Sequence, residues 1–191
     1  MTLPLGTTHP RTPAYIYSCW QTAERALIAE IQSLQQGLAL GIPIAEFEDQ
    51  VKADAEHDAC FAMLAATEGW MTVDFERRRN GLTNDTTMES AFQAIYASAV
   101  NAGRKVSIRD ICREWRVHAR LANKLDIATL LDEYLGLIDF RHWIAHGRCN
   151  LGTPLPGIVE ILSVYAVATE LPKLMRQWRP GLKQSLDFRW P

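Results

Sequence analysis

The stretch SIRDICREWRVHAR, residues 107–120, sorts its side chains by a helical period. Apolar residues recur every three or four positions, which places them on one face of a helix: Ile108, Ile111, Cys112, Trp115 and Ala119. Arginines recur with the same period on another face: Arg109, Arg113, Arg116 and Arg120. Ser107 has a side chain that commonly caps the first amides of a helix. The stretch therefore predicts an amphipathic helix with a buried apolar face and a basic stripe.

Helical patterns continue on both sides of this stretch, separated by helix-breaking residues. Besides the helix that begins at 107, we expect helices over 14–38, 44–79, 86–102, 127–146 and 158–178. Gly69 is a point at which the second of these kinks or divides. Thr86-Thr87-Met88-Glu89 has the pattern of a capping box, and Asp126 is a candidate cap. No stretch alternates apolar and polar residues for the length of a strand. We therefore predict one all-α domain over 1–191, a bundle of five to seven helices with irregular tails at 1–13 and 180–191.

Composition favours a globular protein and excludes several other classes. The chain has 191 residues, of which 48% are hydrophobic, enough to bury a sizeable core. Neither a signal peptide nor an apolar run of membrane-spanning length is visible. The four cysteines are widely spaced and form no zinc-binding pair: Cys19, Cys60, Cys112 and Cys149. Reduced cysteines suit a cytoplasmic protein, which is the location we expect.

Basic residues concentrate in one window of a nearly neutral chain. The formal net charge is −2, so only a local patch can attract nucleic acid. Residues 104–124 hold seven basic and two acidic residues, a local charge of +5, which leaves −7 for the remainder. A stripe of arginines suits a phosphate backbone. The alternative is a solvated face whose arginines pair with the six carboxylates of residues 46–58.

Residues 139–148, DFRHWIAHGR, hold the densest cluster of candidate functional side chains. His142 and His146 have the spacing of the zinc motif HExxH, but Trp143 replaces its glutamate and no third ligand is near, so we expect no metal. Arg141 and His146 are the types of side chain that cleave RNA without a metal. The histidine moves the proton of a ribose 2′-hydroxyl, and the arginine holds the phosphate. The alternative is structural: Arg141 pairs with an acid, and His146 caps the last carbonyls of a helix.

The offset of five residues between Arg141 and His146 is awkward on one helix. It separates their directions by about 140° on a straight helix. The two side chains can still converge if the helix ends at Gly147, or if a second copy of the chain supplies one of them. We therefore expect the site to need a helix end, a dimer, or both.

The extended stretch LGLIDFRHWIAHGR, residues 135–148, resembles the Arg-x(4–6)-His signature of the HEPN (higher eukaryotes and prokaryotes nucleotide-binding) family. An apolar lead-in, an Ile-Ala before the histidine and a glycine after it all agree with that signature. The resemblance covers about fifteen residues, and the rest of the chain is compatible with the family only as a helical bundle. A histidine at 142 departs from the family, in which Asn or Asp is more common.

The resemblance implies a function and a set of site residues. Many proteins of this family are homodimeric, metal-independent endoribonucleases of toxin–antitoxin or antiviral systems, with a composite site across the dimer and no cofactor. The implied catalytic residues are Arg141, His146 and His142, with an acid from an earlier helix, Glu68 in preference to Asp74. The implied RNA-binding residues are Arg148, Arg109, Arg113, Arg116 and Arg120. The alternative reading is a non-catalytic HEPN module that binds a nucleotide or a partner, such as an antitoxin or a nucleotidyltransferase.

Overall fold

The computed structural model describes residues 12–34, 44–145 and 159–179, with no side-chain detail at 32–34 and 44–47. Every regular element in these ranges is an α-helix, as the sequence predicts. The six helices are α1 (Pro13–Leu34), α2 (Ile44–Arg79), α3 (Thr86–Asn101), α4 (Ile108–Leu121), α5 (Leu125–Ala145) and α6 (Ile161–Trp178). None of these helices is long and apolar enough to cross a membrane.

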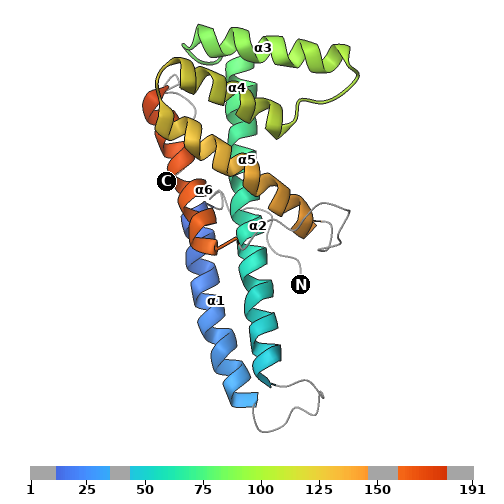
Figure 1. The fold of residues 1–191 in the computed structure, drawn as a ribbon, viewed down its shortest axis with the longest axis vertical. Helices are drawn as coiled ribbons and strands as arrows, with labels where there is room; N and C mark the ends of the chain where they lie inside the picture. Colours follow the sequence, from blue (N-terminus) through green and yellow to red (C-terminus); the bar gives the residue numbers. More distant parts are fainter. Residues whose placement is uncertain (1–11, 35–43, 146–158, 180–191) are drawn as a thin grey trace.

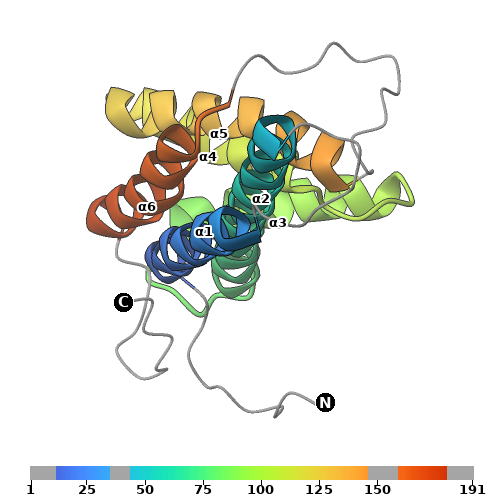
Figure 2. The ribbon, with the colours of Figure 1, turned by 90° about the horizontal axis from the view of Figure 1, so that it is seen from below.

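Helix α2 is the central element of the fold, because it contacts each of the other helices. Helix α1 runs alongside it, α4 and α5 cross it, and α3 lies across its end (Figure 1). Seen from below, α1 and α2 point nearly toward the viewer, whereas α4 and α5 lie across the view (Figure 2). Gly69 does not divide this helix, since α2 is continuous from 44 to 79. The core is centred on fully buried residues of α2, α4 and α5: Met63, Leu64, Met71, Trp115, Leu131 and Tyr134.

The helix caps confirm one prediction and correct two. Ser107 caps α4, and its side chain and that of Asp110 form a reciprocal capping box. The cap of α3 is Asp85 rather than Thr86, because the Asp85 carboxylate accepts a hydrogen bond from the Met88 amide. Asp126 does not cap α5, since that helix begins at Leu125 and places Asp126 in its first turn.

A buried ionic network ties the C-terminal end of α2 to α3 and α6. Arg78 is only 2% exposed, and its guanidinium donates to the carboxylates of Asp74 and Asp85 and to the carbonyl of Arg179. Its Cζ lies 4.8 Å from the ring centroid of Trp115. Burial raises the pKa of Asp74, and the nearby Arg78 opposes that rise. Asp74, the second choice for a catalytic acid, is therefore committed to this structural network.

Candidate functional site

Glu68 of α2 and Arg141 of α5 form an ion pair, which brings together two of the predicted catalytic residues. Nη1 of Arg141 lies 2.7 Å from Oε2 of Glu68, and the two side chains are 21% and 27% exposed. The Arg141 guanidinium also lies over Phe61, with Cζ 5.4 Å from the ring centroid. Nε of Arg141 and Oε2 of Glu68 are both buried without a hydrogen-bond partner among the described residues, so the pair is a contact between charges rather than a well-aligned hydrogen bond. The arginine is thus held in place by a carboxylate and a ring and keeps an unsatisfied donor.

Glu68 also lines a cleft with a volume of about 580 Å³. Helices α2, α3 and α4 form its walls, and His142 of α5 lies at its edge. Its floor is apolar and includes the buried Phe75, Ala99 and Ile111. Glu68 and His142, two of the predicted site residues, therefore share one hollow next to Arg141.

Other predicted site residues fall outside the described part of the chain. His146 and Arg148 lie in 146–158, outside the described residues. The separation of Arg141 and His146 therefore lies outside them too. A zinc site at His142 and His146 would likewise include a residue outside the described part of the chain. Among the described residues, no three His, Cys, Asp or Glu side chains gather as metal ligands. Of the two motif histidines, only His142 can be placed, and its side chain is exposed at the end of α5.

Two buried titratable groups lie close to the Glu68–Arg141 pair. Burial raises the pKa of Cys112 to about 12, and the charge of Glu68 adds to the effect. The thiol is therefore protonated at neutral pH and is a poor nucleophile. Burial also raises the pKa of Tyr134, whose hydroxyl donates to the Leu64 carbonyl at 3.2 Å. Both groups are therefore neutral side chains in the neighbourhood of the ion pair.

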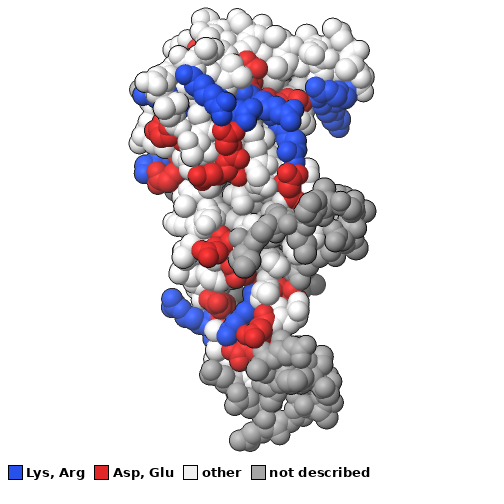
Figure 3. Space-filling model, in the orientation of Figure 1, with Lys and Arg blue, Asp and Glu red and all other residues white. Residues whose placement is uncertain are grey.

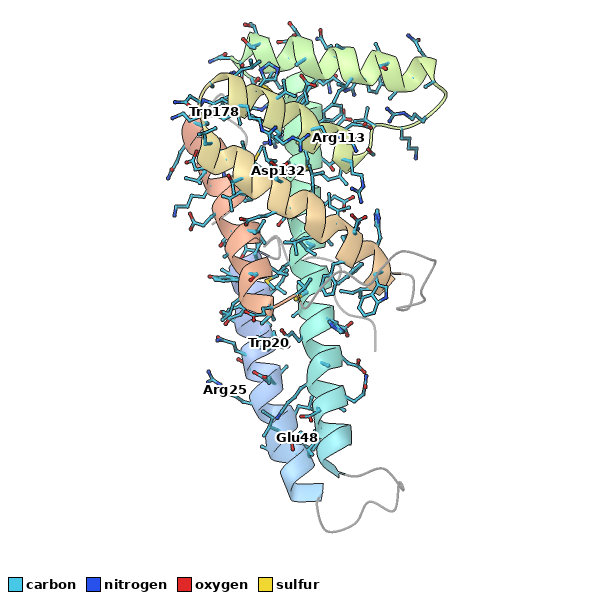
Figure 4. All side chains as sticks on the ribbon, viewed as in Figure 1. Trp20, Arg25, Glu48, Arg113, Asp132 and Trp178 are labelled. Carbon is cyan, nitrogen blue, oxygen red and sulfur yellow. The ribbon has the colours of Figure 1, made fainter. Side chains whose placement is uncertain are left out.

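The arginine stripe of α4 is formed, but most of it is paired within the chain. Arg116 and Arg120 share the carboxylate of Asp132, at 2.5 and 2.7 Å, and Arg109 pairs with Asp139. Their partners lie on α5 and not on residues 46–58, which corrects the alternative drawn from the sequence. Arg113 is exposed and has no carboxylate partner among the described residues. Arg113 and Asp132 lie on adjacent helices (Figure 4).

The paired arginines still leave a basic surface. Three arginines of α4 share the carboxylates of two α5 aspartates, and Arg113 adds a fourth positive charge. A band of Lys and Arg crosses the upper part of the visible face, with acidic side chains below it (Figure 3). Asp132 is 40% exposed and Arg120 is 57% exposed, so these bridges are open to competition from other anions.

The loop between α3 and α4 begins the predicted basic window 104–124, but its place at the rim of a cleft was not predicted from the sequence. Arg104 and Lys105 line the cleft, together with Tyr96 and Val100 of α3. Gly103 has a φ of 65°, a left-handed conformation that favours glycine, and it turns the chain from α3 into this loop. The two adjacent cations at 104 and 105 were visible in the sequence. Nothing in their spacing showed that they line the same cleft as Glu68.

Asp110 fixes the rim by bonding to both ends of this loop. Its carboxylate accepts from Arg104 at 2.6 Å and from the amide and hydroxyl of Ser107. Burial raises the pKa of Asp110, but the hydrogen bonds from Arg104 and Ser107 outweigh it and lower the pKa to about 2. The side chain is therefore ionised at neutral pH and holds Arg104 at the edge of the cleft.

Comparisons with known proteins find no relative of this chain. No model of a known protein family matches the chain, and neither a curated protein nor a solved structure matches it.

Proposed function

We propose that the protein is a metal-independent endoribonuclease of the HEPN type, acting as a homodimer in a toxin or antiviral system. The motif resemblance supplies the reaction class. One structural observation supports its assignment to this chain. The acid expected from an earlier helix, Glu68, is ion-paired with the motif arginine, Arg141, beside a cleft with a basic rim.

The reaction requires one proton removed, one bond formed and one bond broken. The ribose 2′-oxygen attacks the adjacent phosphorus as a histidine, His146 in this proposal, accepts the hydroxyl proton. The bond from phosphorus to the 5′-oxygen breaks, and that oxygen receives a proton from a second acid or from the same histidine. The products are a 2′,3′-cyclic phosphate and a 5′-hydroxyl. No protein nucleophile takes part, in keeping with the protonated thiol of Cys112.

Arg141 binds the phosphate in this scheme, and Glu68 is a positioning residue. A guanidinium can contact two phosphate oxygens and stabilise the charge that develops on them. The ion pair with Glu68 fixes the guanidinium before substrate arrives, which lowers the entropic cost of the contact. His142 lies in the same cleft and is the second histidine available for proton transfer or phosphate contact.

RNA cleavage in the presence of EDTA tests the proposal. Wild-type protein is expected to give cyclic-phosphate ends, and Arg141→Lys and His146→Ala are expected to lose about a hundredfold or more in rate. Arg25→Lys and His118→Ala are matched controls on α1 and α4, and Figure 4 shows Arg25 far from α5. Equal inactivity of wild type and variants on several RNAs, or equal activity of all of them, would contradict the proposal.

A non-catalytic module is the second candidate, and the pairing of the arginines favours it. Glu68 pairs with Arg141, and two α5 carboxylates pair with three arginines of the stripe, so much of this positive charge already has a partner within the chain. Such a module would bind a nucleotide or a partner protein, such as an antitoxin or a nucleotidyltransferase. Its complex is expected to form equally well with His146→Ala and with wild type, in the absence of any RNA cleavage.

A further inference from the structure

We infer that the cleft between α2, α3 and the α3–α4 loop binds one nucleotide of single-stranded RNA next to the scissile phosphate and selects its base. This inference rests on the proposed ribonuclease function, because it assigns a substrate subsite to the same place. It concerns residues that the motif does not contain. These are chiefly Lys105, Tyr96 and Val100.

The shape and chemistry of the cleft suit a nucleobase on an apolar floor. A volume of about 580 Å³ is in the range of small-molecule sites. Val106 and Ile108 continue the apolar floor from the α4 side. Tyr96 forms a wall on the α3 side, and the Arg79 guanidinium covers the ring with Cζ 3.9 Å from its centroid. Because Arg79 occupies one face of this ring, a flat aromatic base would gain burial against the apolar floor and could stack only on the other face of Tyr96.

The charges of the cleft select a nucleotide rather than an uncharged ligand. Its two lining carboxylates are each matched by an arginine: Glu68 by Arg141 and Glu76 by Arg79, at 2.7 and 2.5 Å. Lys105 is exposed on the rim, and its ammonium group has no carboxylate partner among the described residues. The Lys105 ammonium at the rim therefore favours a negatively charged ligand. In this proposal it contacts a phosphate of the RNA backbone.

The rim is built before ligand arrives, which separates this loop from an ordinary basic turn. The Arg104 amide donates to the Ala99 carbonyl at 3.0 Å, closing the end of α3. The Arg104 side chain donates to Asp110 and to the Lys105 carbonyl. The loop is thus fixed at both ends, so the binding of a phosphate by Lys105 costs side-chain entropy but little backbone entropy.

The position of the cleft relates it to the proposed reaction centre. Glu68 and His142 line one end of it, and Lys105 lines the rim formed by the α3–α4 loop. A strand whose scissile phosphate meets Arg141 therefore passes an adjacent nucleotide into the cleft. In this arrangement Lys105 contacts phosphate without regard to sequence, and the apolar pocket distinguishes bases.

The test separates the phosphate contact from the base pocket with two substitutions at exposed positions. Val100 is 53% exposed at the cleft, so Val100→Trp fills the pocket with little risk to folding, and Leu162→Trp on α6 is its control at 59% exposure. Lys105→Gln removes the rim cation, and Lys173→Gln, from a surface pair with Glu170, is its control. The probes are short 2′-O-methyl oligonucleotides of each single base, which cannot be cleaved by 2′-hydroxyl attack.

Wild type and both controls are expected to prefer one base over the least favoured by about tenfold in Kd. Val100→Trp should reduce this preference to less than about twofold. Lys105→Gln should weaken binding of all four probes alike and make the dependence of log K on log salt shallower by about 0.7. An unchanged base preference in Val100→Trp, or an unchanged salt dependence in Lys105→Gln, overturns the inference.

Cleavage of ordinary RNA by the same variants distinguishes the failure of this inference from the failure of the proposed function. If wild type and Val100→Trp cleave RNA with the same preference for the base next to the cleaved bond, the proposed ribonuclease function stands and the inferred base pocket is wrong. If wild type neither cleaves RNA nor binds any of the probes, both are wrong. Binding of the probes with a base preference, without cleavage, supports the pocket and contradicts the ribonuclease.

Discussion

The carboxylate of Glu68 lies 2.7 Å from the guanidinium of Arg141, joining the middle of α2 to the end of α5. The pair has two consequences that are separable by experiment. It fastens two helices that are distant in sequence, and it orients the side chain on which the proposed chemistry depends. Both side chains are mostly buried, so the pair is less screened by solvent than the surface bridges of α4.

The fastening role predicts an energetic coupling between the two residues. Glu68→Gln and Arg141→Met are each expected to lower the free energy of unfolding, because each leaves a mostly buried charge unpaired. The double variant should recover part of the loss, with a coupling of about 1 kcal/mol in a double-mutant cycle followed by urea denaturation. Strictly additive losses would show that the two charges do not stabilise each other.

The buried network at Arg78 predicts a larger loss of stability. Arg78→Met should cost about 3–5 kcal/mol, because it leaves the buried Asp74 without its arginine and leaves Asp85 with Arg179 alone. Arg79→Met is the matched control next to it in α2, since Arg79 pairs with the half-exposed Glu76. The control should cost less than about 1 kcal/mol. Thermal or urea unfolding of the two variants measures the difference, and comparable losses would refute a special role for Arg78.

The shared carboxylate of Asp132 predicts a gain of RNA affinity on mutation. Asp132→Asn releases Arg116 and Arg120 and should tighten binding of single-stranded RNA at low salt while changing stability by less than about 1 kcal/mol. Glu133→Gln makes the same change of charge at the next position of α5 and is the control. Filter binding over a range of salt concentrations measures both. If the two variants behave alike, the α4 stripe is not the RNA-binding surface.

The capping box of α4 predicts how stability responds to acid. An aspartate in an unfolded chain has a pKa of about 3.9. The pKa of Asp110 in the folded chain is about 2, so the unfolded chain binds the proton more readily between these values. The contribution of Asp110 is therefore complete above about pH 5 and is lost as the pH falls toward 2.

Urea denaturation at a series of pH values checks this dependence. Asp110→Asn should lower stability at neutral pH and flatten its acid dependence below pH 5. Asp126→Asn removes a carboxylate from the first turn of α5 without removing a capping box, and it should leave the acid dependence nearly as steep as in wild type. A slope in Asp110→Asn as steep as that of wild type would mean that this aspartate is not the group responsible.

Helical periodicity predicts the elements of this fold well, since it depends on residues close in sequence. The bounds of α2 match the expected 44–79, and Ser107 is the expected cap of α4. Periodicity does not fix which helices become neighbours. The arginines of α4 were expected opposite either RNA or residues 46–58, and the structure gives three of them partners on α5. The error at Asp85 was local, because two adjacent polar residues compete for one cap.

The residues of the candidate site are likewise of two kinds: those that the sequence predicted and those that only helix packing brings to the site. The motif marked Arg141, and the preference for Glu68 over Asp74 agrees with their contacts, since Glu68 reaches Arg141 and Asp74 is bound to Arg78. No pattern in the sequence joined Lys105 or Tyr96 to this place. Lys105 and Tyr96 reach the cleft because α3 packs across α2. That arrangement is a property of packing and not of local spacing.

The length of α2 also sets how its own stability should vary along the chain. Its first turns project with the end of α1 beyond the other helices, whereas its middle is enclosed by α4, α5 and α6 (Figure 1). We expect amide hydrogens near Val51 to exchange with solvent through local fraying, and those near Met71 only through global unfolding. One continuous helix would thus display a gradient of exchange protection. The part of α2 that carries Glu68 would be among the last parts of the molecule to open.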